Sequence, residues 1–200
     1  MLHVGLTGGL ASGKSGVGRT LSELGCFVIR ADDLGHQVLD EARDEIASLF
    51  GREALNPDGS INRRALAARV FADPAELEKL NALVHPAVRA RGRALARAYF
   101  DRNPQGIVVF EAAILVETGS YKDYERLIVA VCRPEQQIER AMARDGLTRE
   151  EILDRMSRQI PLQDKVKYAD YAIDTSGSEE ATAAQTRNVY DALLSLSRGA

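Results

Sequence analysis

The sequence predicts an α/β fold in which a five-stranded parallel sheet lies between two layers of helices. Short apolar runs rich in β-branched residues alternate along the chain with longer amphipathic stretches. The runs are almost continuously apolar, which indicates strands buried on both faces, as in a parallel sheet. The alternation of strand and helix then implies right-handed crossovers and a three-layer architecture.

The expected strands follow these apolar runs in chain order. They are Leu2–Thr7, Cys26–Ile29, Ile107–Phe110, Leu127–Val131 and Tyr171–Ile173. The first helix is expected at Lys14–Leu24 and the last, which is amphipathic, at Ser178–Ser197. The first and last helices therefore flank the sheet in sequence.

A long helical insertion separates the second and third expected strands. Helical spacing appears in Arg63–Phe71, Asp73–Val84 and Pro86–Arg102, with a turn at Asn56–Ser60. A second polar stretch, Arg140–Lys167, also contains helical segments. It is interpreted either as a mobile cover over a site or as an ordinary pair of surface helices.

Composition indicates a globular protein and excludes several functional classes. Hydrophobic residues make up 45% and charged residues 28% of the chain, and the net charge of −3 argues against a chain built to coat nucleic acid. No signal peptide or membrane span is visible, so we expect a cytoplasmic protein. Cys26 and Cys132 are expected to be reduced and buried, and three scattered histidines make a metal site of protein ligands alone improbable.

The segment Gly8–Ser15, GGLASGKS, matches the phosphate-binding pattern GxxxxGK[ST]. Glycines allow successive backbone N–H groups to face a phosphate at a helix N-terminus, where the dipole favours anions. Lys14 would reach the β- and γ-phosphates and Ser15 would bind Mg²⁺. An apolar run precedes the motif and a helical pattern follows it, so the sequence predicts a nucleoside triphosphate site.

The third expected strand ends in an acid, Glu111. A carboxylate at this place can hold the water shell of Mg²⁺, although a strand-end carboxylate facing solvent is the alternative. No NKxD-type guanine signature is present, which disfavours a GTPase. The short chain, the helical insertion and the arginine-bearing segment after the fourth strand fit a kinase whose insertion holds the acceptor and whose second segment closes as a lid.

Seven motifs in order resemble those of the dephospho-CoA kinases, from near residue 2 to about residue 180. They are GLTGGLASGKS, VIRADDLGHQV, INRRALAARVFADP, LNALVHP, ILVE, IERAMARDGLT and RQIPLQDKVKYADYAIDTSG. The resemblance implies a single P-loop kinase domain over residues 1–200. Its core would comprise about 1–32, 104–139 and 168–200, with a CoA-binding helical insertion at about 33–103 and a lid at about 140–167.

The same resemblance assigns the ATP site and the catalytic residues. Lys14, Asp32 and Arg140 would be catalytic, with Asp32 accepting a hydrogen bond from the ribose 3′-hydroxyl and orienting it towards the γ-phosphate. Without the resemblance, an N-cap for a helix beginning near Leu34 would be the favoured role of Asp32, and Asp33 is a second candidate for that cap. The residues expected to bind ATP are Gly8, Gly9, Ala11, Ser12, Gly13, Lys14, Ser15, Gly16, Arg140, Arg144, Asp174 and Ser176.

For the acceptor, the resemblance implies a second set of residues. These substrate-binding residues are Thr7, Asp32, Arg63, Arg64, His85 and Glu117. The two arginines are expected to meet the pyrophosphate of dephospho-CoA, whereas His85 is as readily a packed or capping histidine. Ser15 and Glu111 are the expected metal-site residues, with Glu111 acting directly or through water, and the expected cofactors are ATP and Mg²⁺.

Three positions depart from the family pattern. Arg30 replaces the first acid of an Asp-x-Asp pair, Gly16 stands where threonine is usual, and Ala113 stands where proline is usual. A cation at position 30 cannot replace a carboxylate that organises Mg²⁺. It therefore motivates the alternative of an inactive or weakly active nucleotide-binding module.

The sequence as a whole predicts ATP-dependent phosphorylation of dephospho-CoA to coenzyme A. The expected partner is this small molecule, with no nucleic acid and no membrane, and the protein is expected to be a monomer or a weak homo-oligomer. A kinase for another small acceptor, such as a nucleoside monophosphate or a sugar acid, remains the alternative within the same class.

Overall fold

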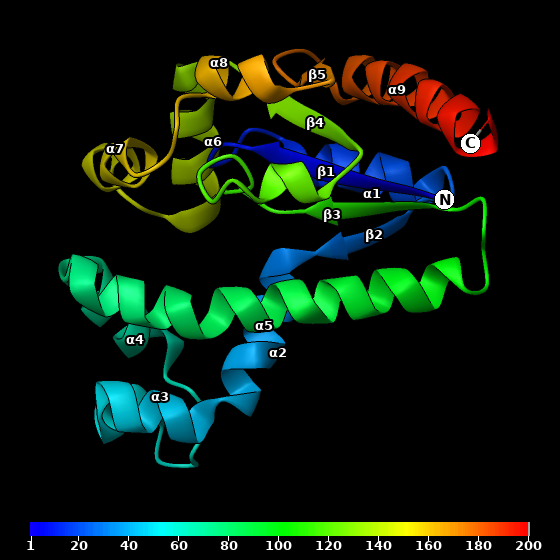
Figure 1. Ribbon diagram of the computed structural model, residues 1–200. Coiled ribbons are helices and arrows are strands. Elements are labelled where there is room, and N and C mark those ends of the chain that lie inside the picture. The colour runs from blue at the N-terminus through cyan, green and yellow to red at the C-terminus, as the bar shows by residue number, and fades with distance from the viewer. Residues whose placement is uncertain (200) are drawn as a thin grey trace. The chain divides into compact units, whose positions relative to one another are not determined.

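The computed structural model describes residues 1–199, apart from the side chain of Phe71. The chain forms two compact units: residues 1–30 together with the residues from Ala96 onward, and residues 31–95. Figure 1 gives the labels of the helices and strands. Among the described residues, no helix is both long enough and apolar enough to span a bilayer.

The first unit contains a five-stranded sheet whose strands are all parallel, in the order β2-β3-β1-β4-β5. The strands are β1 Leu2–Gly8, β2 Phe27–Arg30, β3 Ile107–Glu111, β4 Arg126–Val131 and β5 Tyr171–Asp174. The predicted α/β fold and its five parallel strands are confirmed, with ends shifted by a residue or so. The carboxyl ends of parallel strands share one edge of the sheet, which is where ligands bind in such folds.

One face of this sheet is covered by α1 Lys14–Glu23 and α9 Glu179–Gly199, which also pack against each other (Figure 1). Val17 and Leu21 of α1 and Leu193 of α9 have no exposed surface and join one core with Val4 of β1. The helical spacing of these apolar residues therefore places the start of α1, and the phosphate-binding pattern before it, at the edge of the sheet.

Aromatic residues cover the opposite face. Tyr124, which follows the short 3₁₀ helix η2 Ser120–Asp123, stacks on Phe110 of β3 with ring centroids 5.9 Å apart. Tyr99, near the end of α5 Pro74–Phe100, stacks on Phe27 of β2 at 4.8 Å. The chain between β3 and β4 contains no α-helix, and Tyr124 from this connection packs on the face instead.

Helices fill the polar stretch after β4. They are α6 Pro134–Asp145, α7 Arg149–Ser157, α8 Leu162–Lys165 and the 3₁₀ helix η3 Val166–Tyr168. Ile138, Ala141 and Ile152 form a small cluster between α6 and α7, and Leu10 packs against it. The helical segments expected here are confirmed, and their core reaches the residues that follow β1.

The second unit is helical. It contains α2 Ala31–Glu41, α3 Arg43–Phe50, the 3₁₀ helix η1 Arg52–Ala54, α4 Arg63–Ala72 and the part of α5 up to Leu95. Its core includes Ile46, Phe50, Leu66 and Val70. The predicted turn at Asn56–Ser60 is confirmed, since Leu55 and Ile61 pair across it and Gly59 has a φ of 82°.

Two predicted helix boundaries are wrong. The helix expected near Leu34 begins at Ala31, directly after β2, so Asp32 and Asp33 lie in the first turn instead of capping it. The two helices expected on either side of Pro86 are one helix, α5. An internal proline removes a backbone hydrogen bond at a cost of about 3 kcal/mol. Leu77, Leu80 and Leu83 pack on the core just before it, which stabilises the helix up to the proline.

Candidate active site

The phosphate loop, Gly8–Ser15, joins β1 to α1 at the carboxyl edge of the sheet. Ala11 and Gly13 have positive φ angles of 50° and 80°. Gly13 is the N-cap of α1 and no side chain caps the helix. A Cβ at Gly13 would lie 2.7 Å from Thr175 Oγ1, so both the backbone angle and the packing require glycine. The uncapped N-terminus of α1 is a favourable place for an anion.

Glu111 is the polar centre of the site. Its side chain is only 3% exposed, and Oε1 accepts hydrogen bonds from Lys14 Nζ at 3.0 Å and Ser15 Oγ at 2.9 Å. Arg30 Nε lies 3.6 Å from Oε2, which is buried and accepts no hydrogen bond among the described residues. The alternative of a strand-end carboxylate facing solvent is therefore wrong.

Gly18 makes room for this carboxylate. It lies one turn into α1, and a Cβ there would approach Glu111 Oε2 to 2.5 Å. Because Glu111 is held by Lys14 and Ser15, its carboxylate could not move aside without losing those bonds. The glycine is thus part of the geometry of the site, although it contributes no polar group.

Two glutamines hold the peptide groups on either side of Leu10. Leu10 N–H donates to Gln159 Oε1 at 2.9 Å, and Gln137 Nε2 donates to the Leu10 carbonyl at 2.7 Å. A Cβ at Gly9 would approach Gln137 Nε2 to 2.5 Å, so the glycine allows this close contact. The outer part of the phosphate loop is therefore fixed by residues from α6 and from the segment after α7.

Thr175 connects the phosphate loop with Arg140. Its hydroxyl donates to the Ser12 carbonyl at 2.8 Å, and Arg140 donates to Thr175 Oγ1 at 3.2 Å and to the Thr175 carbonyl at 2.7 Å. Asp174 Oδ1 accepts from Ser176 N at 2.8 Å, and hydrogen bonds from Ser176 lower the pKa of the Asp174 carboxyl. The turn after β5 is thus a fixed structure that positions an arginine beside the phosphate loop.

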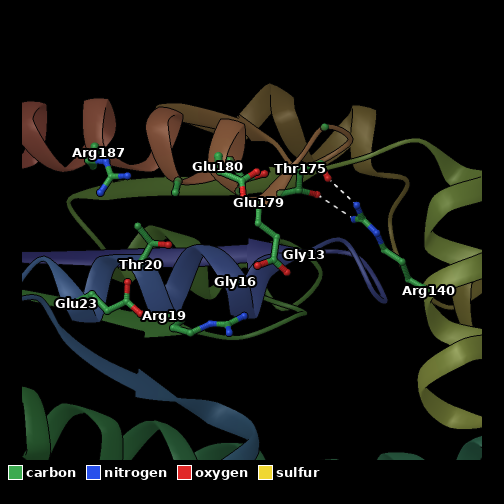
Figure 2. A pocket seen from close by; sticks show the side chains of 13 residues that line it. Gly13, Gly16, Arg19, Thr20, Glu23, Arg140, Thr175, Glu179, Glu180 and Arg187 are labelled. Atoms are coloured by element: carbon green, nitrogen blue, oxygen red, sulfur yellow. Dashed lines mark hydrogen bonds between the residues drawn. The ribbon is translucent and has the colours of Figure 1, made fainter.

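A cavity of about 520 Å³ lies beside this turn, between α1 and α9. Figure 2 shows Arg19, Thr20 and Glu23 on the α1 side and the first turn of α9 opposite them. The lining residues are Gly13, Gly16, Arg19, Thr20, Glu23, Arg140, Thr175, Gly177, Glu179, Glu180, Thr182, Ala183 and Arg187. The cavity is continuous with the phosphate loop, since Gly13 of that loop is one of its lining residues.

Other residues predicted for the site already have partners within the chain. Thr7 Oγ1 donates to the Ala113 carbonyl at 3.1 Å, and Thr7 has no exposed surface. Glu117 Oε1 lies 2.6 Å from Lys165 Nζ and accepts from Ile160 N at 3.1 Å. Arg144 pairs with Asp145 through two hydrogen bonds, which lower the pKa of the Asp145 carboxyl.

Four predicted residues belong to the second unit. Asp32 lies in the first turn of α2, Arg63 and Arg64 lie in the first turn of α4, and His85 lies within α5. Arg63 donates to Asp40 Oδ2 at 2.9 Å. Burial and the positive charge of Arg89 lower the pKa of His85, which favours its neutral form. The partners of these residues, Asp40 and Arg89, also belong to the second unit.

Several residues that shape the site are not predicted from the sequence. They are Gly18, Gln137, Gln159, Lys165 and Thr175. Lys165 and Gln159 lie in polar stretches where nothing distinguishes a buried side chain from an exposed one. Thr175 stands between Asp174 and Ser176, but its hydroxyl contacts depend on the meeting of β5 and the phosphate loop.

Comparison with known protein families identifies the family of this chain. A sequence model described as dephospho-CoA kinase matches residues 2–180. This chain belongs to the dephospho-CoA kinase family. The resemblance in its ordered motifs is thereby confirmed, and membership in this kinase family implies ATP as the phosphoryl donor.

Dephospho-CoA kinases from several bacteria align with nearly the whole chain. The enzyme from Aquifex aeolicus is 38% identical over 196 residues, covering 96% of this chain and 98% of the relative. The enzyme from Syntrophus aciditrophicus is 37% identical over 201 residues, covering 99% of this chain and 86% of the relative. The shared region therefore includes both compact units.

Solved structures agree with this assignment. A crystal structure of a Thermus thermophilus protein has a TM-score of 0.82 at 32% identity, covering 96% of each chain. A dephospho-CoA kinase from Campylobacter jejuni has a TM-score of 0.64 at 25% identity, with the same coverage. A shikimate kinase from Bacteroides thetaiotaomicron, 12% identical with a TM-score of 0.54, covers 96% of this chain and shares the fold alone.

Proposed function

We propose that this member of the dephospho-CoA kinase family transfers the γ-phosphoryl group of ATP to the ribose 3′-hydroxyl of dephospho-CoA, giving coenzyme A and ADP. The observation that carries the proposal is the meeting of Lys14 and Ser15 on the buried carboxylate of Glu111, at the uncapped N-terminus of α1. This arrangement suits a phosphorylated nucleotide, and family membership supplies the acceptor.

The ATP site follows from the phosphate loop and the cavity beside it. Backbone N–H groups between Gly8 and Gly16 would bind the phosphates, and Lys14 would reach the β- and γ-phosphates. The adenosine would occupy the cavity between α1 and α9, against the turn of Asp174 and Ser176. Arg140 lines this cavity, and Arg144 lies one turn further along α6.

Mg²⁺ fits the residues present. Glu111 Oε2 is a buried carboxylate oxygen that accepts no hydrogen bond from the described part of the chain, and the Ser15 hydroxyl bonds the other oxygen of the same group. No cluster of three or more His, Cys, Asp or Glu suited to a metal occurs among the described residues. Mg²⁺ that arrives with a nucleotide is held chiefly by phosphates and water. Ser15 and Glu111, directly or through water, would hold Mg²⁺, which would neutralise charge on the β- and γ-phosphates.

Transfer requires positioning and charge stabilisation more than covalent help from the protein. Asp32 would accept a hydrogen bond from the 3′-hydroxyl, aim its oxygen at the γ-phosphorus and take the proton as the new P–O bond forms. Lys14 and Arg140 would stabilise the charge on the transferring group and on the departing ADP. The two hydrogen bonds from Arg140 to Thr175 fix the arginine before ATP binds, which lowers the cost of reorganisation.

The acceptor site would include the second unit. A cavity of about 370 Å³ there is lined by Asp40, Arg43, Gly59, Ser60, Ile61 and Arg63. Arginine forks suit a pyrophosphate, so Arg63 and Arg64 would bind the acceptor anion, with Arg63 leaving its partner Asp40. His85 would contribute as a neutral hydrogen-bonding group.

Glu117 would act at the acceptor, whereas Thr7, whose side chain is fully buried, would act only through the backbone that it holds. The Thr7 hydroxyl donates to the Ala113 carbonyl and so fixes the chain just beyond Glu111. Glu117 keeps one carboxylate oxygen, Oε2, that has no hydrogen-bond partner among the described residues. A monomeric or weakly oligomeric state and a cytoplasmic location belong to the same proposal.

The contact between Arg30 and Glu111 favours one rival, a nucleotide-binding module without turnover. The guanidinium stands 3.6 Å from the oxygen that would otherwise serve Mg²⁺. Such a module would bind ATP through the phosphate loop but phosphorylate no acceptor. The variant Arg30→Asp, which restores the acid usual in the family, would then gain activity.

The deciding experiment measures ADP release from Mg-ATP with dephospho-CoA, using AMP, CMP and pantetheine phosphate as comparison acceptors. Turnover confined to dephospho-CoA is the expected result, because a wrong acceptor leaves polar groups of the site unpaired. Preference for another acceptor would replace the proposed substrate within the same reaction class. ATP binding without turnover on any acceptor would favour the non-catalytic module.

A further inference from the structure

Lys165 is a lysine at the end of α8 with no exposed surface. Its ammonium group contacts three acceptors: the Gly8 carbonyl at 3.0 Å, the Ala113 carbonyl at 2.8 Å and Glu117 Oε1 at 2.6 Å. An ammonium has three N–H donors, so each has an acceptor. Burying a charge is costly unless its hydrogen-bonding groups are satisfied, so three satisfied donors indicate that the buried position of this ammonium group is specific.

The two carbonyls lie next to the two halves of the phosphoryl-transfer site. Gly8 ends β1 and opens the phosphate loop that leads to Lys14. Ala113 lies two residues beyond Glu111, which ends β3. The Thr7 hydroxyl also donates to the Ala113 carbonyl, so the end of β1 and the backbone following β3 are tied together at one point. Lys165 therefore bridges the backbone that carries Lys14 and the backbone that carries Glu111.

The charge of Lys165 interacts with two neighbouring charged groups, Glu117 and Lys14. Burial lowers the pKa of Lys165, Glu117 opposes that change, and the positive charge of Lys14 lowers the pKa further. The two ammonium groups therefore interact, although Lys165 has no exposed surface. Because Glu117 pairs with Lys165 at 2.6 Å, the bridge adds little net charge, and its effect on the loop comes from the hydrogen bonds to the two carbonyls.

The residues around Lys165 connect it to the segment after α7. Glu117 Oε1 also accepts from Ile160 N, and the neighbouring Gln159 accepts from Leu10 N. The segment from Gln159 to Lys165 thus contacts the phosphate loop at Gly8 and at Leu10. Lys165 forms the buried end of this attachment.

We propose that Lys165 is a positioning residue for phosphoryl transfer, which fixes the phosphate loop relative to the strand end that carries Glu111. The inference rests on the proposed binding of ATP at that loop. Lys165 acts through the carbonyls of Gly8 and Ala113 and does not touch the reacting atoms. If Lys165 served stability alone, removing it together with its partner charge would leave ATP binding and turnover of the folded protein unchanged.

The test compares double variants, because Lys165→Met alone leaves Glu117 as a buried charge without its partner and can fail to fold. Glu117→Gln/Lys165→Met removes both charges and all donors of Lys165. Glu117→Gln/Lys165→Gln removes both charges but keeps amide donors for the two carbonyls. Glu117→Gln alone is the baseline, so any loss caused by Glu117 itself cancels. Lys167→Met, the same substitution at an exposed lysine two residues away, is the matched control.

The readouts are the Kd for a fluorescent ATP analogue and kcat per mole of folded protein. Relative to the baseline, the Lys165→Met double variant is expected to bind the analogue about tenfold more weakly and to lose on the order of 10- to 100-fold in kcat. The Lys165→Gln double variant should recover part of both losses. Lys167→Met should match the wild type.

Two results would overturn the proposal. If the Lys165→Met double variant equals the baseline in Kd and kcat, Lys165 contributes to stability alone. If both double variants are equally impaired, its bonds to Gly8 and Ala113 are not what matters. The Kd measurement needs no acceptor, so it tests the role of Lys165 even if the wild-type protein does not phosphorylate dephospho-CoA. That failure would count against the proposed function and not against the role of Lys165.

Discussion

Lys14 Nζ and Glu111 Oε1 lie 3.0 Å apart, although 97 positions separate the two residues in the chain. Parallel pairing of β1 with β3 brings them together, with Leu6 opposite Glu111 in register. The Ser15 hydroxyl bonds the same oxygen at 2.9 Å. The cation expected to bind phosphate, the hydroxyl and the carboxylate expected to serve Mg²⁺ therefore form one preorganised group.

Glu111→Gln tests this group. The amide keeps the shape of the side chain but removes the charge that pairs with Lys14 and would attract Mg²⁺. We expect kcat to fall on the order of 100-fold and half-maximal rate to require more Mg²⁺. Initial rates over a series of Mg²⁺ concentrations measure both. Glu135→Gln, at an exposed residue of α6, is the control, and an unchanged Mg²⁺ requirement in Glu111→Gln would contradict the assignment.

Gly16 and Gly18 provide a matched pair within α1. A Cβ at Gly16 meets nothing within 4 Å, whereas one at Gly18 comes within 2.5 Å of Glu111 Oε2. Gly16→Ala should raise the free energy of unfolding by up to about 1 kcal/mol, through helix propensity. Gly18→Ala should lower it by about 1–3 kcal/mol, because the buried carboxylate must shift. Urea unfolding of both variants measures these values, and changes of the same sign would refute the packing argument.

Thr175→Val removes the hydroxyl that contacts Ser12 and Arg140 while nearly preserving shape. The Ser12 carbonyl and Arg140 each lose one hydrogen bond. The free energy of unfolding is expected to fall by about 1–2 kcal/mol and the KM for ATP to rise, because Arg140 is less well positioned. Thr175→Ser keeps the hydroxyl and should stay closer to wild type in both quantities. If Ser and Val behave alike, the hydroxyl has no such role.

The lowered pKa of His3 leads us to expect that the stability of the protein depends on pH. The His3 ring lies 4.8 Å from that of Tyr124, centroid to centroid, and burial lowers the pKa of His3 from 6.5 despite opposition from Glu125 and Asp123. The unfolded state therefore binds a proton at higher pH than the folded state does. Stability is full above pH 6.5 and declines as the pH falls below 6.5.

His3→Phe removes that titration and should flatten the decline. His85, whose pKa is also lowered, keeps a contribution of the same sign in the variant. Urea unfolding of wild type and variant at several pH values measures the effect, with the difference well above pH 6.5 as the reference. Parallel curves below pH 6.5 would show that His3 does not contribute.

The sheet and the phosphate loop could be predicted from the sequence because their signals are local. Apolar runs define strands, and GGLASGKS needs only its own residues to form a phosphate loop. The start of α2 cannot be predicted, because Ala31 follows β2 without a turn and no breaker separates strand from helix. The sequence wrongly predicts a boundary at Pro86, because the packing of α5 on its unit is not visible in a short window of sequence.

The surroundings of the site could not be predicted, because they depend on contacts between distant segments. Lys165 lies in the polar sequence QDKVKYAD, where it differs from Lys167 in no local property, yet one is fully buried and the other is exposed. The burial of Lys165 depends on Gly8, Ala113 and Glu117, which come from three other parts of the chain.

The peptide groups of Leu10 are held from both sides, by Gln159 at the N–H and by Gln137 at the carbonyl. Any separation of α6 and the segment after α7 from the phosphate loop must break one of these bonds. The exchange rate of the Leu10 amide hydrogen with solvent deuterium would then report separation of the segment after α7, because Gln159 is the acceptor of that amide. A single backbone amide, observed without any label or bound nucleotide, can thus serve as a gauge of how often this part of the molecule opens.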